Sequence, residues 1–156
     1  GNDLDAEFHA WIDCLVAGGD CSGGGDGIPT LKVVEYAGGA LAVRSLVEGV
    51  EDLHIRYGMD SNTDGVPDCY VVDPTVDAAP AGCAGTWSTV DAENWANVVA
   101  LDIRVLIRSL EQHSGWEDTR TYDLGRASRS GPFNDGFKRR VMNTSVMVNN
   151  IAGVRE

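Results

Sequence analysis

Residues 60–68 combine oxygen-bearing side chains and one glycine at a spacing that suits a divalent cation. The stretch reads Asp-Ser-Asn-Thr-Asp-Gly-Val-Pro-Asp, with side-chain oxygens at relative positions 1, 3, 5 and 9 and glycine at position 6. Calcium takes about six to eight oxygen ligands at roughly 2.3–2.6 Å, and a tightly curled loop turns alternate side chains inward. The expected Ca2+ ligands are the side chains of Asp60, Asn62, Asp64 and Asp68 and the backbone carbonyl of Val66.

This acidic loop, residues 60–68, differs from an EF-hand. Position 12 is Val71 rather than glutamate, and strands rather than helices are expected on both sides. The loop is instead similar to the calcium loops of thrombospondin type 3 and dockerin-like sequences, and Asp73 could complete the coordination sphere. The alternative is a solvated Asp/Asn/Gly turn. Three carboxylates within nine residues repel one another unless a cation neutralises them, which favours a structural calcium site.

Four cysteines indicate a disulfide-bonded, exported protein. No pair has the C-x-x-C spacing of a zinc or redox motif. Of the three possible pairings, the local one closes two short loops in glycine-containing segments, where a covalent link adds most. It joins Cys14 to Cys21 and Cys69 to Cys83. Four reduced thiols in a cytosolic protein are the alternative.

The charge balance excludes two classes of partner. Asp and Glu number 24 against 12 Lys and Arg, a net charge of -12, whereas phosphate and anionic lipid need clustered cations. The excess is local, because residues 1–77 hold 15 acids and three bases and the rest is balanced. No nucleophile–base motif or phosphate-binding loop is present in the sequence, so no catalytic residue is predicted. An extracellular hydrolase fragment is the weaker alternative.

Hydrophobic alternation with a period of two predicts a mainly antiparallel β-sheet. Leu53, Ile55 and Tyr57 are expected on a buried face, with His54 on the solvent face. A short helix is expected at 91–95, capped by Asp91. Strands are expected at 8–16, 31–36, 41–46, from 50, 69–72, 98–108 and 140–149, and residues 109–136 form an irregular excursion with a short strand near 121–124. The fold class is α+β, with one domain over 1–156.

Several blocks of the sequence resemble one known family. Residues 46–60, which lead into the acidic loop, resemble a signature stretch of the PilW-type minor pilins of the type IV pilus. Residues 28–31, 95–108 and 139–150 are also similar to that family, so the resemblance covers roughly 28–150 in separated blocks. The resemblance implies a pilin-like head whose N-terminal spine helix is missing from this chain. GspJ, a secretion-system pseudopilin, represents the related class.

The resemblance also implies function, partners and location. Such a protein takes part in priming and assembly of the pilus, near its tip, with other minor pilins and the major pilin as partners. It is anchored in the inner membrane by an N-terminal helix absent here, with a periplasmic head that later reaches the cell surface. Without that helix, an apolar face is expected on the odd-numbered residues of 99–107 and on Leu53, Ile55 and Tyr57. The alternative is a secreted calcium-dependent β-domain that acts as an adhesin or binding module.

Overall fold

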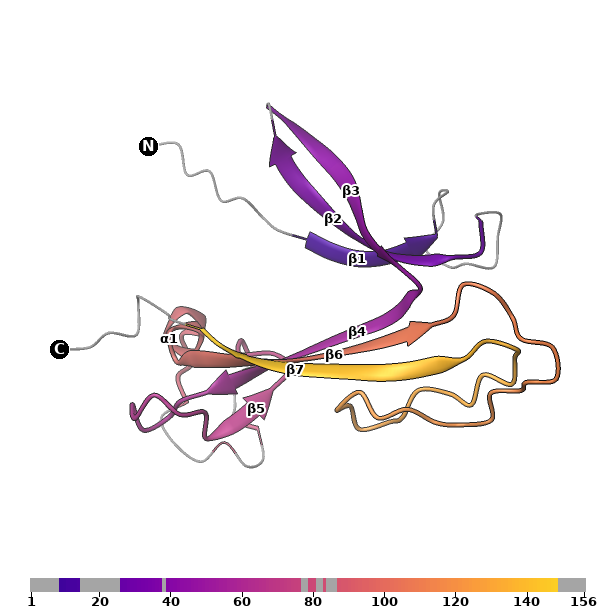
Figure 1. Ribbon diagram of the computed structural model, residues 1–156. Coiled ribbons are helices and arrows are strands. Elements are labelled where there is room, and N and C mark those ends of the chain that lie inside the picture. The colour runs from indigo at the N-terminus through magenta and orange to yellow at the C-terminus, as the bar shows by residue number, and fades with distance from the viewer. Residues whose placement is uncertain are drawn as a thin grey trace. The chain divides into compact units, whose positions relative to one another are not determined.

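The computed structural model describes residues 9–14, 26–37, 39–76, 79–80, 83 and 87–148. This part of the chain contains seven strands and one short helix, so the predicted β-rich fold with a single helix is confirmed (Figure 1). The elements are β1 (His9–Cys14), β2 (Pro29–Ala37), β3 (Ala40–Glu48), β4 (Val50–Met59), β5 (Cys69–Val71), α1 (Asp91–Ala96), β6 (Val98–Arg108) and β7 (Arg139–Met147).

The first three strands form an antiparallel sheet in the order β1-β2-β3. In its register His9 lies opposite Val34, and Thr30 lies opposite Glu48. Gly39, with φ of 88°, turns the chain between β2 and β3, as expected for a hairpin with a left-handed residue. β3 lies at the edge of this sheet, and all nine of its residues are exposed.

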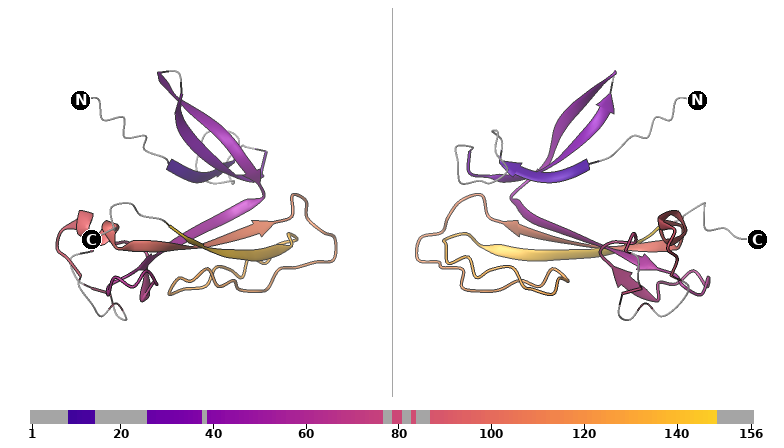
Figure 2. Two further views of the ribbon diagram at one scale, coloured as in Figure 1. Left: turned by 60° about the vertical axis from the view of Figure 1, so that its left-hand side comes forward. Right: turned by 180° about the vertical axis from the view of Figure 1, so that it is seen from behind.

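The other four strands form a sheet in the order β5-β4-β6-β7, and two further views show β6 and β7 running side by side (Figure 2). Hydrogen bonds at both ends show that β6 is antiparallel to β4 and to β7. They run from Arg108 N to Gly49 O, Asp60 N to Asn97 O, Ser109 N to Lys138 O and Val148 N to Val99 O, at 2.8–2.9 Å. These long pairings position the acidic loop at the end of β4.

Gly49 is the single residue between β3 and β4. Its backbone N–H donates to Pro29 O at 2.7 Å and its carbonyl accepts from Arg108 N at 2.8 Å. Its φ is 80°, and a Cβ built there would lie 2.8 Å from Arg108 O. Only glycine combines the left-handed backbone with so close an approach, so this residue fixes how the chain leaves one sheet and enters the other.

The chain divides into two compact units, each made of two stretches. The first unit comprises 1–53 with 105–142, and the second comprises 54–104 with 143–156. In the first, Leu106, Tyr122 and Leu124 form a core with Val141 against it. In the second, the buried residues are Met59, Val71, Cys83 and Val98, with Tyr57, Cys69, Trp87 and Leu101 packed around them. The expected single domain over 1–156 stays a prediction.

Two details of the predicted elements are wrong. The helix begins at Asp91, but its N-cap is Val90, which makes no side-chain capping bond, so Asp91 is the first helical residue rather than the cap. The strand expected near 121–124 is reduced to one isolated bridge between Tyr122 and Ser130. One error concerns the end of a helix and the other a short strand pairing, and both features depend on residues distant in sequence.

The solvent face expected for β4 is also wrong. His54 is half-buried like its neighbours, and the charged residues on either side of it are paired with other segments. Arg126 binds Asp52, and Arg56 binds the buried Asp102. Along β6 the even-numbered Val98, Ala100 and Leu106 are buried, while the odd-numbered residues of 99–107 are half-buried. Among the described residues no helix is long and apolar enough to cross a membrane.

Candidate functional site

Asp60 organises the first half of the acidic loop. Its carboxylate is buried and accepts three backbone N–H bonds, from Asn62 at 3.2 Å, Thr63 at 2.7 Å and Gly65 at 2.8 Å. Thr63 and Gly65 adopt positive φ, 66° and 83°, which curls the backbone around this carboxylate. One side chain therefore satisfies the donors of a turn that has no strand partner.

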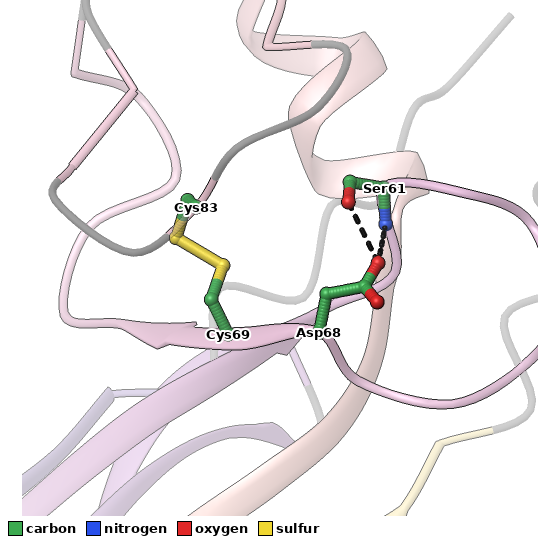
Figure 3. The surroundings of a disulfide bond; sticks show 4 residues. All are labelled: Ser61, Asp68, Cys69 and Cys83. Carbon is green, nitrogen blue, oxygen red and sulfur yellow. Dashed lines mark hydrogen bonds between the residues drawn. A yellow bond between two sulfur atoms is a disulfide. The ribbon is translucent and has the colours of Figure 1, made fainter.

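Asp68 closes the second half of the loop. Its Oδ2 accepts from the Ser61 backbone N at 2.8 Å and from Ser61 Oγ at 2.6 Å (Figure 3). The amide of Asn62 donates to its Oδ1 at 3.3 Å. The Ser61 hydroxyl and N–H hold the pKa of the Asp68 carboxyl below its ordinary value. All these donors are neutral, so the carboxylate is solvated by the loop without losing its charge.

The remaining predicted ligands are also turned toward the backbone of the loop. Asn62 Oδ1 accepts from Asp64 N at 3.0 Å, and Asp64 Oδ1 accepts from Val66 N at 2.8 Å. In the part of the chain that the structure describes, no three His, Cys, Asp or Glu side chains converge as a metal centre requires. The donors are hard oxygens that suit Ca2+, but a shared metal would need Asp64 and Asp68 to turn toward one point.

Asp73 takes no part in the acidic loop. Its Oδ1 accepts from the backbone N of Thr75 at 2.8 Å and from the Thr75 hydroxyl at 2.6 Å, which closes a separate turn. These two donors hold the pKa of Asp73 below its ordinary value. The carboxylate therefore has a local structural role.

The predicted Cys69–Cys83 disulfide is confirmed. Its Cα atoms lie 5.3 Å apart, and Cys69 directly follows Asp68 (Figure 3). Cys83 is buried in the core of the second unit, so the bond fastens the end of the acidic loop to that core. The Cys14–Cys21 pairing involves Cys21, which lies outside the described residues, and it stays a prediction.

A cavity of about 260 Å3 lies in the second unit beside the acidic loop. Trp87 is oriented there by a bond from Nε1 to Val76 O at 2.7 Å, and Ser88 Oγ donates to Glu93 at 2.5 Å. Two acidic residues, Asp60 and Glu93, belong to its lining. The lining residues are Asp60, Ser61, Thr63, Trp87, Ser88, Glu93 and Asn97.

The first unit contains a cluster that sequence reasoning missed. Arg139 at the start of β7 is 1% exposed and donates to three carboxylates. Its Nε lies 2.5 Å from Glu51, its Nη1 and Nη2 lie 2.6 and 2.7 Å from Asp135, and Nη1 lies 3.3 Å from Asp118. These four residues are called the Arg139 cluster. Burial alone would lower the pKa of Arg139, but the three carboxylates outweigh it and raise that pKa.

Asp118 is the most enclosed acid of the Arg139 cluster, with a side chain that is 0% exposed. Burial raises its pKa, but bonds from Tyr122 Oη at 2.6 Å, Arg120 Nε at 2.9 Å and Arg139 outweigh that effect and lower the pKa below 3.8. For Tyr122, burial and the bond to Asp118 raise the pKa to about 12. The hydroxyl therefore stays protonated and donates to a charged carboxylate.

The Arg139 cluster connects three segments that lie far apart in the sequence and resemble the PilW-type family: 46–60, 95–108 and 139–150. Glu51 belongs to 46–60 and Arg139 to 139–150, while Arg108, the last residue of 95–108, binds Glu51 at 3.3 Å. In the sequence, the sign of this cluster is the pair Arg139–Arg140 at the start of the last strand. Its partner Glu51 lies 88 residues away, too far for any periodicity argument.

Comparison with known proteins identifies the family. The model of the family described as Type IV Pilus-assembly protein W (PilW) matches residues 19–150. A search of curated proteins and a search of solved structures each gave no match. The matched range contains the acidic loop and all members of the Arg139 cluster.

Proposed function

The chain belongs to the PilW family of type IV pilus-assembly proteins, and from this premise we propose that it is a minor pilin that helps to prime the pilus near its tip. Family membership implies involvement in pilus assembly, contact with other pilus components and association with the cell envelope. The proposed partners are other minor pilins and the major pilin. The proposed role is structural, without catalysis.

The match over residues 19–150 is the observation that carries this proposal. The structure supports it because the blocks that resemble the family meet at Glu51, which binds Arg108 and Arg139. These side chains hold three strands of one sheet in register, as a rigid head for protein–protein assembly requires. We further propose a pilin-like head, anchored in the inner membrane through an N-terminal helix and exposed first to the periplasm and then at the surface.

Deletion and complementation test the assembly role. A strain lacking the gene is expected to lose surface pili and twitching, and the wild-type gene is expected to restore both. Arg129→Met, which changes an exposed arginine outside the Arg139 cluster, should restore piliation, whereas Arg139→Met should not. Co-purification with other minor pilins after crosslinking checks the partners directly. Normal pili and twitching in the deletion strain would contradict the proposal.

We also propose that the acidic loop holds a structural Ca2+ through Asp60, Asn62, Asp64, Asp68 and the carbonyl of Val66. The spacing and hard oxygen donors support this, together with the positive φ of Gly65. Because a ligand that binds only the folded state stabilises it, millimolar Ca2+ should raise the melting temperature relative to EDTA.

The calcium test needs a matched variant. Asp64→Asn removes one proposed ligand and should reduce the calcium-dependent shift in melting temperature. Asp91→Asn removes the same charge from the exposed surface of α1 and should leave the shift unchanged. A wild-type melting temperature that is the same in EDTA and in millimolar Ca2+, with no heat of binding in titration calorimetry, would overturn the calcium proposal while leaving the assembly role intact.

A further inference from the structure

Three exposed cations of the first unit, Arg129, Lys138 and Arg140, have no carboxylate partner among the residues that the structure describes. Arg129 donates to the carbonyl of Thr121, at 3.4 Å. Lys138 directly precedes β7 and Arg140 is its second residue, so strand alternation places them on one side, opposite the buried Arg139. The arginines of this unit that pair with carboxylates within 4 Å are Arg44, Arg108, Arg120, Arg126 and Arg139. The contrast marks Lys138 and Arg140 as available for an outside partner.

An exposed tryptophan accompanies these cations. Trp116 is 38% exposed, and its Nε1 donates to Phe137 O at 3.2 Å, which fixes the ring. Lys138 Nζ lies 5.7 Å and Arg120 Cζ lies 5.1 Å from its centroid. Trp116, Arg120, Lys138 and Arg140 are called the cationic face. Tryptophan and arginine are the residues that most often dominate the binding energy of protein interfaces.

Edge protection is the simpler explanation of the charges. β7 lies at the edge of its sheet, and lysine on an edge strand discourages pairing with other chains. That function needs only the charges of Lys138 and Arg140. It gives no reason for an anchored, solvent-exposed Trp116 beside them, since an apolar ring at an edge promotes association.

The chain itself carries the complementary surface. Residues 57–103 hold eight acids and no Lys, Arg or His. Among the acids of this stretch that the structure describes, the exposed ones are Asp64, Asp68, Asp73, Asp91 and Glu93. Glu93 also lines the 260 Å3 cavity together with Asp60 and the aromatic ring of Trp87, which are groups that accept an ammonium or guanidinium. We propose that the cationic face of one copy docks on this acidic stretch of a second copy.

The net charge of -12 does not prevent such a contact. At about 0.1 M ionic strength, charges more than roughly 10 Å apart are largely screened. The charges at the contact, rather than the net charge, therefore determine whether two copies associate. The two surfaces differ, so the contact is heterologous and leaves one surface of each kind free at the ends of the assembly. Association is therefore concentration-dependent and sensitive to salt.

Sedimentation velocity with the purified chain tests the docking. At about 100 µM protein we expect a mass above that of the monomer in about 50 mM NaCl, and a monomer in about 500 mM NaCl. Lys138→Glu/Arg140→Glu is expected to weaken association at least about tenfold. The control is Arg44→Glu/Arg129→Glu, which makes the same change in net charge at exposed positions outside the cationic face and should associate like the wild type.

A charge exchange tests the acidic partner. Asp91→Lys/Glu93→Lys alone should be monomeric, but its mixture with Lys138→Glu/Arg140→Glu should form heterodimers through the restored complementarity. Asp91→Asn/Glu93→Gln provides a milder variant, and circular dichroism confirms folding. A wild-type monomer in low salt overturns the proposal, as does equal weakening by the control pair. So does binding of duplex DNA or anionic vesicles by the cationic face without self-association. None of these outcomes depends on piliation, so this proposal and the assembly role fail separately.

Discussion

The Arg139 cluster and the acidic loop each collect three acidic side chains, and they stabilise the carboxylates in different ways. In the cluster, one buried guanidinium bridges Glu51, Asp118 and Asp135. In the loop, backbone N–H groups and the hydroxyl of Ser61 surround Asp60 and Asp68, and no cation takes part among the described side chains there. Arg108 on Glu51 and Arg120 on Asp118 complete the charge balance of the first region, which makes it a structural core. The second region retains its charge and can attract a cation.

Replacing the central cation should have the largest effect. Arg139→Met leaves three carboxylates, one of them fully buried, without their common partner, and breaking a buried pair costs about 3–5 kcal/mol. Urea denaturation measures the free energy of unfolding. Arg140→Met, at the exposed neighbouring position, should change it by less than about 0.5 kcal/mol. Equal losses in the two variants would remove the distinction between cluster and surface.

The second unit should depend on its covalent link instead. Cys69→Ala/Cys83→Ala opens a loop with a sequence separation of 14, which costs about 3 kcal/mol in the chain-entropy model. Reducing the wild type with dithiothreitol should reproduce the loss of unfolding free energy. If neither treatment lowers the free energy of unfolding, hydrogen bonds alone hold the acidic loop. The two regions would then differ more clearly, with ion pairs in the Arg139 cluster and neutral hydrogen bonds in the loop.

The backbone beside Glu51 offers an intermediate effect. Gly49→Ala places a Cβ 2.8 Å from Arg108 O at a φ of 80°, so we expect a loss of about 1–3 kcal/mol. Gly39→Ala has a similar φ of 88° but meets no atom within 4 Å. The difference between the two free energies of unfolding therefore measures the close approach that connects β4 to β6. A difference of zero would show that the strand ends move apart freely.

Acid should act on the Arg139 cluster. The pKa of Asp118 and the pKa of Asp135 are lowered in the folded state. At pH values near and below the ordinary pKa of 3.8, the unfolded chain therefore binds more protons than the folded chain. The free energy of unfolding should accordingly fall as the pH drops from about 4 toward 2. Arg139→Met should flatten this slope in a series of urea titrations, and Arg140→Met should preserve it. An unaltered slope in Arg139→Met would exclude the cluster as its source.

The smallest effect is expected in the acidic loop. Asp68→Asn keeps one oxygen acceptor for Ser61 and removes a charge that is exposed to water. The melting temperature in EDTA should therefore change less than in Arg139→Met, in the cysteine double variant or in Gly49→Ala. With millimolar Ca2+ present, the same variant should lose part of the stabilisation proposed for the metal. A large loss in EDTA would show that the carboxylate stabilises the loop without a metal.

Most strands could be predicted because they depend on local pattern. Val98–Arg108 was expected with the same bounds, since its alternating β-branched residues favour an extended strand wherever it pairs. The acidic loop was recognisable for the same reason, because all its groups lie within nine residues. Local sequence also favoured the Cys69–Cys83 pairing.

The remaining features depend on contacts distant in sequence. Asp52, on the same side of β4 as His54, binds Arg126 from 74 residues away. Arg139 is buried because it pairs with Glu51, 88 residues away, and no local pattern indicates such a partner. The prediction that Asp91 caps α1 was wrong. Asn94, inside the helix, exchanges hydrogen bonds with the backbone of Ser88 and so fixes the segment that leads into α1 without Asp91. Whether the loop oxygens converge on a metal likewise depends on the metal itself.

The disulfide also limits how far the chain extends under mechanical load. An extended chain spans at most about 3.3–3.6 Å per residue. The bond between Cys69 and Cys83 bypasses a sequence separation of 14 with a Cα distance of 5.3 Å. A molecule pulled from its two ends should thus reach about 40–45 Å less than its reduced form. β5 remains tied to Cys83 in the oxidised molecule even after the hydrogen bonds of its sheet have opened.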